Sequence, residues 1–415
     1  MTINYGFRYS ETDNPDGLQH VFAKARAIPD DDHIAPRLGF TYTPGGTGTD
    51  VIRGGFGVFY GRTPSLLFAS QVQQPDIFPF LGRINVRPGE AGFVPLGTPI
   101  DNENPLLDAA NSPAFVDPPF RDAKSTRVNV GYERELRPNW SAGVDVVYAE
   151  GDHLQSNAEL NRTVTFDEFG RPIFSGTRPN PLYNEIFTRQ SVGMSKYEAV
   201  TLKVRKRFSG RSMFQAHYTR AKDRDTDSNE RSATGITLSS YQPFADGISL
   251  SSADPGYDWG LSSRDVKNRF VVSGLVDLGA GLRLSGIAEY RSGVPFNLTD
   301  ADADFVHCGF FGLGFNCPDA RPVLNGQVVA RNTGTNESVS RVDLRLSKMF
   351  QFGGNRELGV FVEVFNLFDD QAFVVDRGFG GDDQRDPTHE DFGLADVRTE
   401  DIGQRQAQLG ARFRF

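Results

Sequence analysis

The sequence contains little cysteine, tryptophan and methionine, and no long run of apolar residues. Its 415 residues include 2 Cys, 2 Trp and 4 Met. Because no apolar run approaches the roughly 20 residues that a membrane-spanning helix needs, helical membrane proteins are excluded. Positive charge is also scarce, since 53 acidic residues outnumber 44 basic ones and leave a net charge of -9. A nucleic-acid partner, which requires a basic surface, is therefore not expected.

A secretory signal is also missing from the amino-terminal residues. The first stretch, "MTINYGFRYSETDNPDG", has neither a basic start nor an apolar core of the secretory type. We expect either a protein that is not exported or a sequence whose true start is missing.

Glycine and phenylalanine are abundant, with 44 and 34 residues, and apolar residues alternate with polar ones along most of the chain. This period of two predicts β-strands, each close to the roughly 9 to 11 residues that a tilted strand needs to cross a bilayer. About twelve strands are expected, at Ile3 to Tyr9, Ile34 to Thr43, Val51 to Tyr60, Ser125 to Leu136, Trp140 to Glu150, Tyr197 to Phe208, Met213 to Ala221, Asn268 to Leu278, Leu282 to Arg291, Val339 to Phe350, Leu358 to Phe368 and Gln404 to Phe415.

The connections between these strands alternate between short and long. Short links such as "RPN", "SGRS" and "GAG" separate polar excursions at Ser10 to His33, Gly61 to Lys124, Gly151 to Lys196, Lys222 to Lys267, Ser292 to Ser338 and Asp369 to Gly403. Excursions of this length are uncommon in a compact soluble domain. Short periplasmic turns and long extracellular loops are typical of an antiparallel transmembrane β-barrel.

The two faces of the predicted strands differ in polarity. In "SVSRVDLRLSKMF", Val342 and Leu344 alternate with charged neighbours. A soluble β-sandwich also alternates, but a face that stays charged along whole strands, with Tyr60, Tyr148 and Tyr290 near strand ends, favours a wet lumen inside an apolar outer band. The residues predicted to face the lumen are Arg127, Glu133, Arg283, Glu289, Arg291, Arg341, Asp343, Arg345 and Glu363.

An ordered set of motifs resembles the carboxyl-terminal barrel of TonB-dependent outer-membrane receptors, and most closely the Oar-like subgroup. The motifs are "IAPRLGFTYTP", "DVIRGGFGVFYGR", "NRFVVSGLVDL", "YRSGVPFNLT", "RNTGTNESVSRVDLRLSKMF", "VFVEVFNLFD" and "LGARFRF". The resemblance implies an outer-membrane protein of the Gram-negative type that takes up a ligand, with energy relayed by the TonB complex.

The same resemblance implies parts that this sequence does not show. Family members have a signal peptide, a TonB box, a plug inside the lumen and a barrel of 22 strands. We therefore interpret residues 1–415 as a partial receptor-like barrel domain, the carboxyl-terminal part of a longer barrel, which would reach the TonB complex only through a plug. A free-standing barrel of twelve strands is also even-numbered and thus allowed. The lumen charges would contact a plug or simply be solvated.

Catalytic and metal sites have little support in the sequence. His217 is predicted on a polar strand face as an ordinary lumen residue, and no serine is marked as its partner, so we expect no enzyme and no cofactor. The acids Asp300, Asp302 and Asp304 have the alternate spacing of a calcium loop but lack its turn glycine and distal glutamate. A solvated acidic loop is the favoured interpretation, and no metal is expected.

Cys308 and Cys317 are predicted to form a disulfide. They are the only two cysteines, they flank the short segment "GFFGLGFN", and a protein that passes through the periplasm meets oxidising conditions. A loop this small gives about 2 to 3 kcal/mol of stabilisation in loop-entropy terms. Two free thiols are the alternative.

The chain ends on an aromatic residue. Leu409, Phe413 and Phe415 share one face of the last predicted strand. This ending resembles the signal by which the β-barrel insertion machinery recognises its substrates; the alternative is an aromatic that only packs.

The sequence therefore predicts an outer-membrane receptor or transporter whose partners are membrane lipid and the insertion machinery, and whose ligand the sequence does not identify. Three alternatives stay open at this point. They are a passive twelve-stranded porin or adhesin, an outer-membrane hydrolase that uses His217, and a secreted soluble β-protein.

Overall fold

The computed structural model describes residues 1–13, 32–63, 114–116, 120–159, 164–174, 179–181, 187–226, 241–242, 249–250, 259–300, 321–353, 356–375, 382–395, 397–398 and 403–415. The remaining residues lie in the long excursions between strands or in short gaps beside them.

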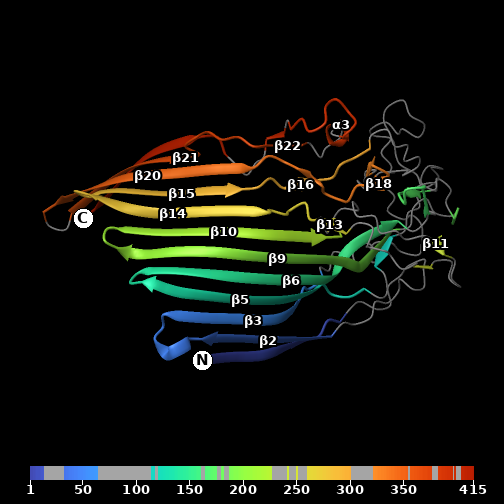
Figure 1. The fold of residues 1–415 in the computed structure, drawn as a ribbon, viewed down its shortest axis with the longest axis horizontal. Helices are drawn as coiled ribbons and strands as arrows, with labels where there is room; N and C mark the ends of the chain where they lie inside the picture. The colour runs from blue at the N-terminus through green and yellow to red at the C-terminus, as the bar shows by residue number, and fades with distance from the viewer. Residues whose placement is uncertain are drawn as a thin grey trace, which may run out of the picture.

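One antiparallel sheet dominates the structure, and its strands follow one another in chain order (Figure 1). All twelve predicted strands are confirmed. They are β1 (Thr2–Ser10), β2 (His33–Tyr42), β3 (Asp50–Tyr60), β5 (Lys124–Arg137), β6 (Trp140–Glu159), β9 (Phe187–Ser209), β10 (Ser212–Asp225), β14 (Asn268–Gly279), β15 (Leu282–Arg291), β20 (Val339–Phe352), β21 (Arg356–Phe365) and β24 (Gln406–Arg414). The order places β1 and β24 at opposite sides of the sheet.

Tight links join the strands at one end of the sheet. Asn139 between β5 and β6, and Gly210 and Arg211 between β9 and β10, have positive φ angles of 70°, 54° and 72°. Gly210 and Arg211, both at positive φ, form a two-residue hairpin turn whose twist matches that of the flanking strands, whereas Pro138 fixes a negative φ and leaves Asn139 alone in the left-handed region of its link. The short links are thus compact hairpins, and the long excursions all leave the sheet at its other end, here called the outer end (Figure 1).

Two strands extend further than their residue pattern predicts. The expected ends were Glu150 and Tyr197, whereas β6 continues to Glu159 and β9 begins at Phe187. Their pairing shifts register between Gly151 and Leu154 and again between Leu154 and Ser156. Because each bulge changes which face the following residues take, the alternation is lost although the pairing continues.

Small elements gather at the outer end. They are the short strands β4 (Ala114–Val116), β7 (Val164–Phe166), β8 (Pro172–Phe174), β11 (Tyr241–Gln242), β12 (Ser249–Leu250), β13 (Gly260–Leu261), β16 (Pro295–Phe296), β17 (Val323–Leu324), β18 (Gln327–Val328), β19 (Gly334–Thr335), β22 (Phe373–Val374) and β23 (Val397–Arg398), with one turn of helix, α3 (Asp382–Arg385). A 3-10 turn, η2 (Pro44–Gly46), lies instead in the short link between β2 and β3.

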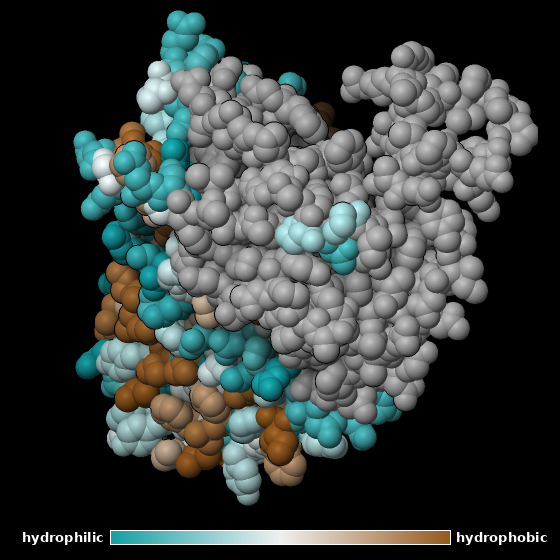
Figure 2. Space-filling view, turned by 90° about the vertical axis from the view of Figure 1, so that its right-hand side faces the viewer, coloured by the Kyte–Doolittle hydropathy of each residue, from teal (hydrophilic) through white to brown (hydrophobic). Residues whose placement is uncertain are grey.

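The main sheet exposes apolar side chains on one face, here called the apolar face. Tyr5 and Phe7 of β1 are 88% and 79% exposed, and Leu409 of β24 is 75% exposed. Similar side chains follow on the strands between them, and Figure 2 shows brown apolar side chains gathered along the lower left of the molecule. A soluble sandwich would cover such a face with a second sheet. A single layer with this exposed apolar surface suits contact with lipid.

Buried apolar side chains are few in the described residues, and several lie at the outer end. Val116, Phe296 and Val375 are almost fully enclosed. No helix of the described part of the chain is long and apolar enough to span a membrane.

Candidate functional site

The second face of the sheet, here called the charged face, holds every residue predicted to face the lumen. Arg127 and Glu133 stand on β5, Arg283, Glu289 and Arg291 on β15, Arg341, Asp343 and Arg345 on β20, and Glu363 on β21. The register pairs Glu289 with Arg341, and Arg345 with Glu363, so alternate residues of neighbouring strands share the face. Strand periodicity therefore placed these nine residues together; their roles stay predictions.

Many of these charges pair across neighbouring strands. Arg269 Nη2 lies 2.8 Å from Glu289 Oε1, Arg345 Nη1 lies 2.9 Å from Glu363 Oε1, and Arg283 Nε lies 2.6 Å from Asp277 Oδ1. Each pair joins adjacent strands, so it both neutralises charge and fixes side-chain positions on the wall. Such ladders make a heavily charged interior tolerable.

Four adjacent strands contribute a further charge network. Lys203 Nζ on β9 lies 2.7 Å from Asp145 Oδ2 on β6 and 3.7 Å from Glu133 on β5. Arg53 Nη2 on β3 donates to the same Glu133 carboxylate at 3.1 Å. Two cations thus share two carboxylates, and the alternating residue pattern does not predict which of these charges meet.

Arg127 differs from its paired neighbours. Its guanidinium lies 5.5 Å from the ring centre of Phe59, and Arg37 lies 4.7 Å from the same ring. The ring occupies the space above Gly57, where a Cβ atom would come within 2.8 Å of it. A cation over an aromatic face is held by the ring quadrupole, so this part of the wall keeps two exposed positive charges.

A pocket of about 560 Å³ opens on the charged face at its outer end. It spans the outer ends of β9, β10, β14, β15 and β20, and two further residues come from the link that precedes β14. The lining residues are Tyr197, Thr201, Thr219, Ala221, Asp223, Arg264, Val266, Arg269, Glu289, Arg291, Val339 and Arg341. Three of them, Glu289, Arg291 and Arg341, are residues that the alternating pattern assigned to the lumen.

The link over this pocket, residues 259–267, is fixed to the end of β10. Its strand β13 pairs with Arg224 and Asp225, Ser262 N donates to Asp223 O at 3.0 Å, and Asp223 N donates to Asp265 Oδ1 at 2.7 Å. Asp225 in turn forms a buried ion pair with Arg331. The backbone that carries Arg264 is therefore tied down at several points.

Asp223 titrates in an unusual range. It is the twelfth residue of β10 and thus follows the roughly 9 to 11 residues with which a tilted strand crosses a bilayer. Burial, helped by the charges of Asp225 and Asp265 and opposed by Arg264, raises the pKa of Asp223 to about 6. A carboxylate in the pocket lining therefore changes charge close to neutral pH.

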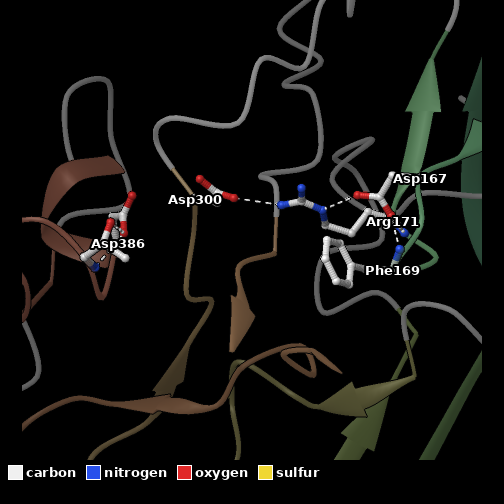
Figure 3. Close-up of polar contacts among 6 residues, drawn as sticks. Asp167, Phe169, Arg171, Asp300 and Asp386 are labelled. Atoms are coloured by element: carbon white, nitrogen blue, oxygen red, sulfur yellow. Dashed lines mark hydrogen bonds and ion pairs between the residues drawn. The ribbon is translucent and has the colours of Figure 1, made fainter. Parts of the chain in front are cut away.

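Two outer loops are braced by Arg171 (Figure 3). Its Nε donates to Asp167 Oδ2 and its Nη1 to Asp300 Oδ2, both at 2.7 Å. Burial raises the pKa of Asp167, but hydrogen bonds from Arg171 and Phe169 outweigh it and hold the pKa below the ordinary value. Asp300, a residue of the calcium-like pattern, is thus bound to arginine, whereas Asp302 and Asp304 lie outside the described residues.

A buried histidine, His33, was not singled out from the sequence. Its Nε2 lies 3.0 Å from Asp122 Oδ2, and its ring stacks on Tyr60 at 4.0 Å between ring centres. Asp122 also accepts hydrogen bonds from Thr63 N at 3.1 Å and from the Thr12 hydroxyl at 3.3 Å. The carboxylate thereby joins segments at the ends of β1, β2, β3 and β5, which indicates a structural role.

The other predicted residues have the following positions. His217 lies on the charged face of β10, beside Lys203 and Val271 in the register. Leu409 and Phe413 lie on the apolar face of β24, and Phe415 follows the strand with 94% of its surface exposed. Cys308 and Cys317 fall outside the described residues, so their disulfide stays a prediction.

Solved structures of similar fold are outer-membrane transporters. The outer membrane transporter YddB from Escherichia coli superimposes with a TM-score of 0.54 at 11% identity, covering 92% of this chain and 41% of its own. The FrpB iron transporter from Neisseria meningitidis gives 0.47 at 9% identity, covering 99% and 42%. The ferric-catecholate import receptor Fiu from Escherichia coli gives 0.43 at 12% identity, again covering 99% and 42%. This chain thus spans about two fifths of these proteins.

No curated protein matches the sequence. The expected resemblance to TonB-dependent outer-membrane receptors is confirmed at the level of the fold, while the Oar-like subgroup stays a prediction. The protein is located in the outer membrane, which sets aside the soluble alternative. The profile of the family described as Outer membrane beta barrel domain matches residues 1–324, and the chain belongs to that family.

Proposed function

We propose that this chain forms barrel wall and outer loops of a TonB-dependent transporter, which takes up a ligand across the outer membrane. The observation that carries the proposal is the pocket on the charged face at the end where the long loops leave the sheet. A ligand that passes the outer loops enters the end of the sheet where this pocket opens. The charged face then continues toward the short-turn end as a polar path.

The chain's own residues hold the wall, and a plug supplies the coupling to TonB. Paired charges such as Arg345 with Glu363 keep the wall fixed, while the exposed Arg37 and Arg127, which lie outside the pocket, offer contacts to a plug. The similar fold of the YddB transporter supports the barrel architecture. Membrane lipid and the barrel insertion machinery are the further partners of the proposal.

We do not propose an enzyme. The buried pair of His33 and Asp122 lacks the order of a catalytic triad, because the Thr63 hydroxyl donates to the aspartate and not to the histidine. His217 stands beside Lys203 and Val271, neither of which is a nucleophile of the serine type. A passive porin or adhesin is the remaining alternative.

Two measurements on the full-length protein that carries this chain test the proposal without knowledge of the ligand. In planar lipid bilayers we expect no steady open conductance, because a plug fills the lumen. We also expect binding to the purified periplasmic domain of TonB. A stable open channel together with no TonB binding would overturn the proposal in favour of a passive porin.

A further inference from the structure

We propose that the outer pocket binds a small anionic ligand through its carboxylate or phosphate groups. This inference rests on the proposed transport function and names the ligand class for the same site. It is argued from the charges, hydroxyl groups, rigidity and size of the pocket.

Positive charge prevails in the pocket lining. Four arginines, Arg264, Arg269, Arg291 and Arg341, face two carboxylates, Asp223 and Glu289. Glu289 is already bonded to Arg269 at 2.8 Å, and Arg341 Nε is bonded to Asp343 at 2.9 Å. The four arginines still outnumber Asp223, Glu289 and Asp343 by one, so an incoming anion meets a net positive surface.

Guanidinium groups suit the proposed ligand chemistry. Arginine presents planar donors in a fork that matches two oxygens of a carboxylate or phosphate, and such charge-assisted bonds are about twice as strong as neutral ones. Arg264 comes from the link and Arg291 from the end of β15, so the pocket carries these donors on separate elements. An anion between separate donors would be bound from more than one direction.

Hydroxyl groups provide neutral contacts in the same pocket. The Thr201 and Thr219 hydroxyls lie 2.9 Å apart on neighbouring strands, and Tyr197 adds a third hydroxyl. Hydroxyl groups can both donate and accept, so they suit the uncharged polar part of an organic ligand. Sugars and organic acids carry such groups beside their anionic ones.

Rigidity and size favour a small molecule. The link that carries Arg264 is fixed by Ser262, Asp265 and the pairing of β13, so its backbone position does not depend on a ligand. The volume of about 560 Å³ lies inside the roughly 300 to 1,000 Å³ of small-molecule sites. The pocket can enclose a small ligand or the anionic end of a larger one.

The test measures ligand binding by calorimetry with purified full-length protein in detergent at constant ionic strength. The probes are citrate for carboxylates, glucose 6-phosphate for phosphate esters and glucose as the uncharged control. The variants are Arg264→Gln and Arg291→Gln. Arg127→Gln is the matched control, because it removes the same charge from the same face outside the pocket.

We expect citrate or glucose 6-phosphate to bind, glucose not to bind, and each pocket variant to weaken binding about tenfold or more. The Arg127→Gln variant should bind as the unchanged protein does. Equal weakening by Arg127→Gln would show a general charge effect and overturn the site, as would binding of glucose alone or of no probe.

These outcomes are separable from failure of the proposed function. Binding that depends on Arg264 and Arg291 in a protein that forms a stable open channel and fails to bind TonB would keep the anion site and remove the transport proposal. TonB binding without anion binding would keep the transport proposal and remove the anion site. The probe that binds more tightly, citrate or glucose 6-phosphate, shows whether the site prefers carboxylate or phosphate groups.

Discussion

Asn366 shows how a single side chain fixes the outer end of a strand. It is 2% exposed, its Nδ2 donates to Asp370 O and Gly403 O at 2.9 Å each, and its Oδ1 accepts from Asp370 N at 3.1 Å. Its φ angle of 49° lies in the left-handed region that asparagine tolerates. The side chain therefore ends β21 and ties it to the segment before β24.

Replacing Asn366 by alanine should destabilise the protein by about 2 to 5 kcal/mol, because three backbone groups lose their partners in a buried place. Thermal unfolding in detergent measures the change. Asn325→Ala is the matched control, since Asn325 has a similar φ of 54° in an exposed turn and should lose only about 1 to 2 kcal/mol of backbone preference. Equal losses in the two variants would contradict the role of the Asn366 hydrogen bonds.

The raised pKa of Asp223 predicts how anion binding in the outer pocket depends on pH. Its pKa of about 6 is raised by burial and by Asp225 and Asp265, against Arg264. As pH falls through this value the carboxylate becomes neutral, so an anion should bind more tightly at about pH 5 than at about pH 8. The same raised pKa means that folding stability increases as pH falls from about 6 toward the ordinary value of 3.8.

Sulfate is a suitable probe for this prediction because it stays doubly charged across the range. Asp223→Asn should bind sulfate more tightly near pH 8 and lose most of the pH dependence. Asp145→Asn removes a carboxylate of the charged face outside the pocket and should leave the pH dependence in place. An unchanged slope in Asp223→Asn would show that another group titrates.

At the scale of elements, the strands could be predicted and the outer connections could not. A strand shows a period of two in consecutive residues, so the positions of all twelve main strands could be predicted from the sequence. The pattern failed beyond Glu150, where His153 has a φ angle of 56° and the register of β6 against β9 shifts. A bulge reverses the faces, and a simple alternation cannot follow it.

The outer contacts depend on residues far apart in the chain. Arg171 meets Asp300, Arg331 meets Asp225 and His33 meets Asp122, at separations of 129, 106 and 89 residues. Each residue taken alone resembles any charged or polar residue of a solvated loop. Only the sheet order brings the loops together, so the charged face could be predicted residue by residue, but the pocket's closing link with Arg264 could not.

The last strand carries a prediction about assembly. β24 pairs with β21 along nine residues, and Phe415 lies just past this pairing with its ring 6.2 Å from that of Phe413. Because Phe415 is almost fully exposed, its deletion removes little packing from the folded protein. We expect the deletion to lower outer-membrane levels of the full-length protein in cells, while protein already folded in detergent keeps nearly the same melting temperature.

Membrane fractionation and a detergent melting curve measure the two effects. Phe413→Ala is the comparison. Phe413 stands within the paired strand opposite Leu358, so its replacement should lower the melting temperature. Normal outer-membrane levels after deletion of Phe415 would leave this residue as a packing aromatic without a role in recognition.

At the scale of the whole molecule, the sheet has two edges that need partners in a membrane. In the described residues β1 pairs with β2 and β24 pairs with β21, and their outer sides carry no further strand of the main sheet. Unpaired backbone groups in hydrocarbon cost several kcal/mol each, so open edges do not persist there. The edges must meet each other, a second copy, or further strands of a longer barrel, and the proposed function favours the last.

Disulfide cross-linking of the full-length protein in membranes separates these arrangements. Cys308 and Cys317 are first replaced by serine, and then cysteine pairs are scanned with Tyr5→Cys on β1 against Ala407→Cys, Leu409→Cys and Ala411→Cys on β24. Tyr5→Cys with Leu38→Cys is the positive control, because these residues stand opposite each other in the register of β1 and β2. Directly opposite strand residues lie within the distance that a disulfide spans.

We expect the control pair to cross-link and the pairs between β1 and β24 to stay reduced, because other strands of a larger barrel separate the two edges. A cross-link within one chain would show that the twelve strands close on themselves, as the passive porin requires. A cross-linked dimer would show instead that a second copy completes the barrel. Either cross-link would overturn the larger barrel, since one strand edge cannot pair with two neighbours at once.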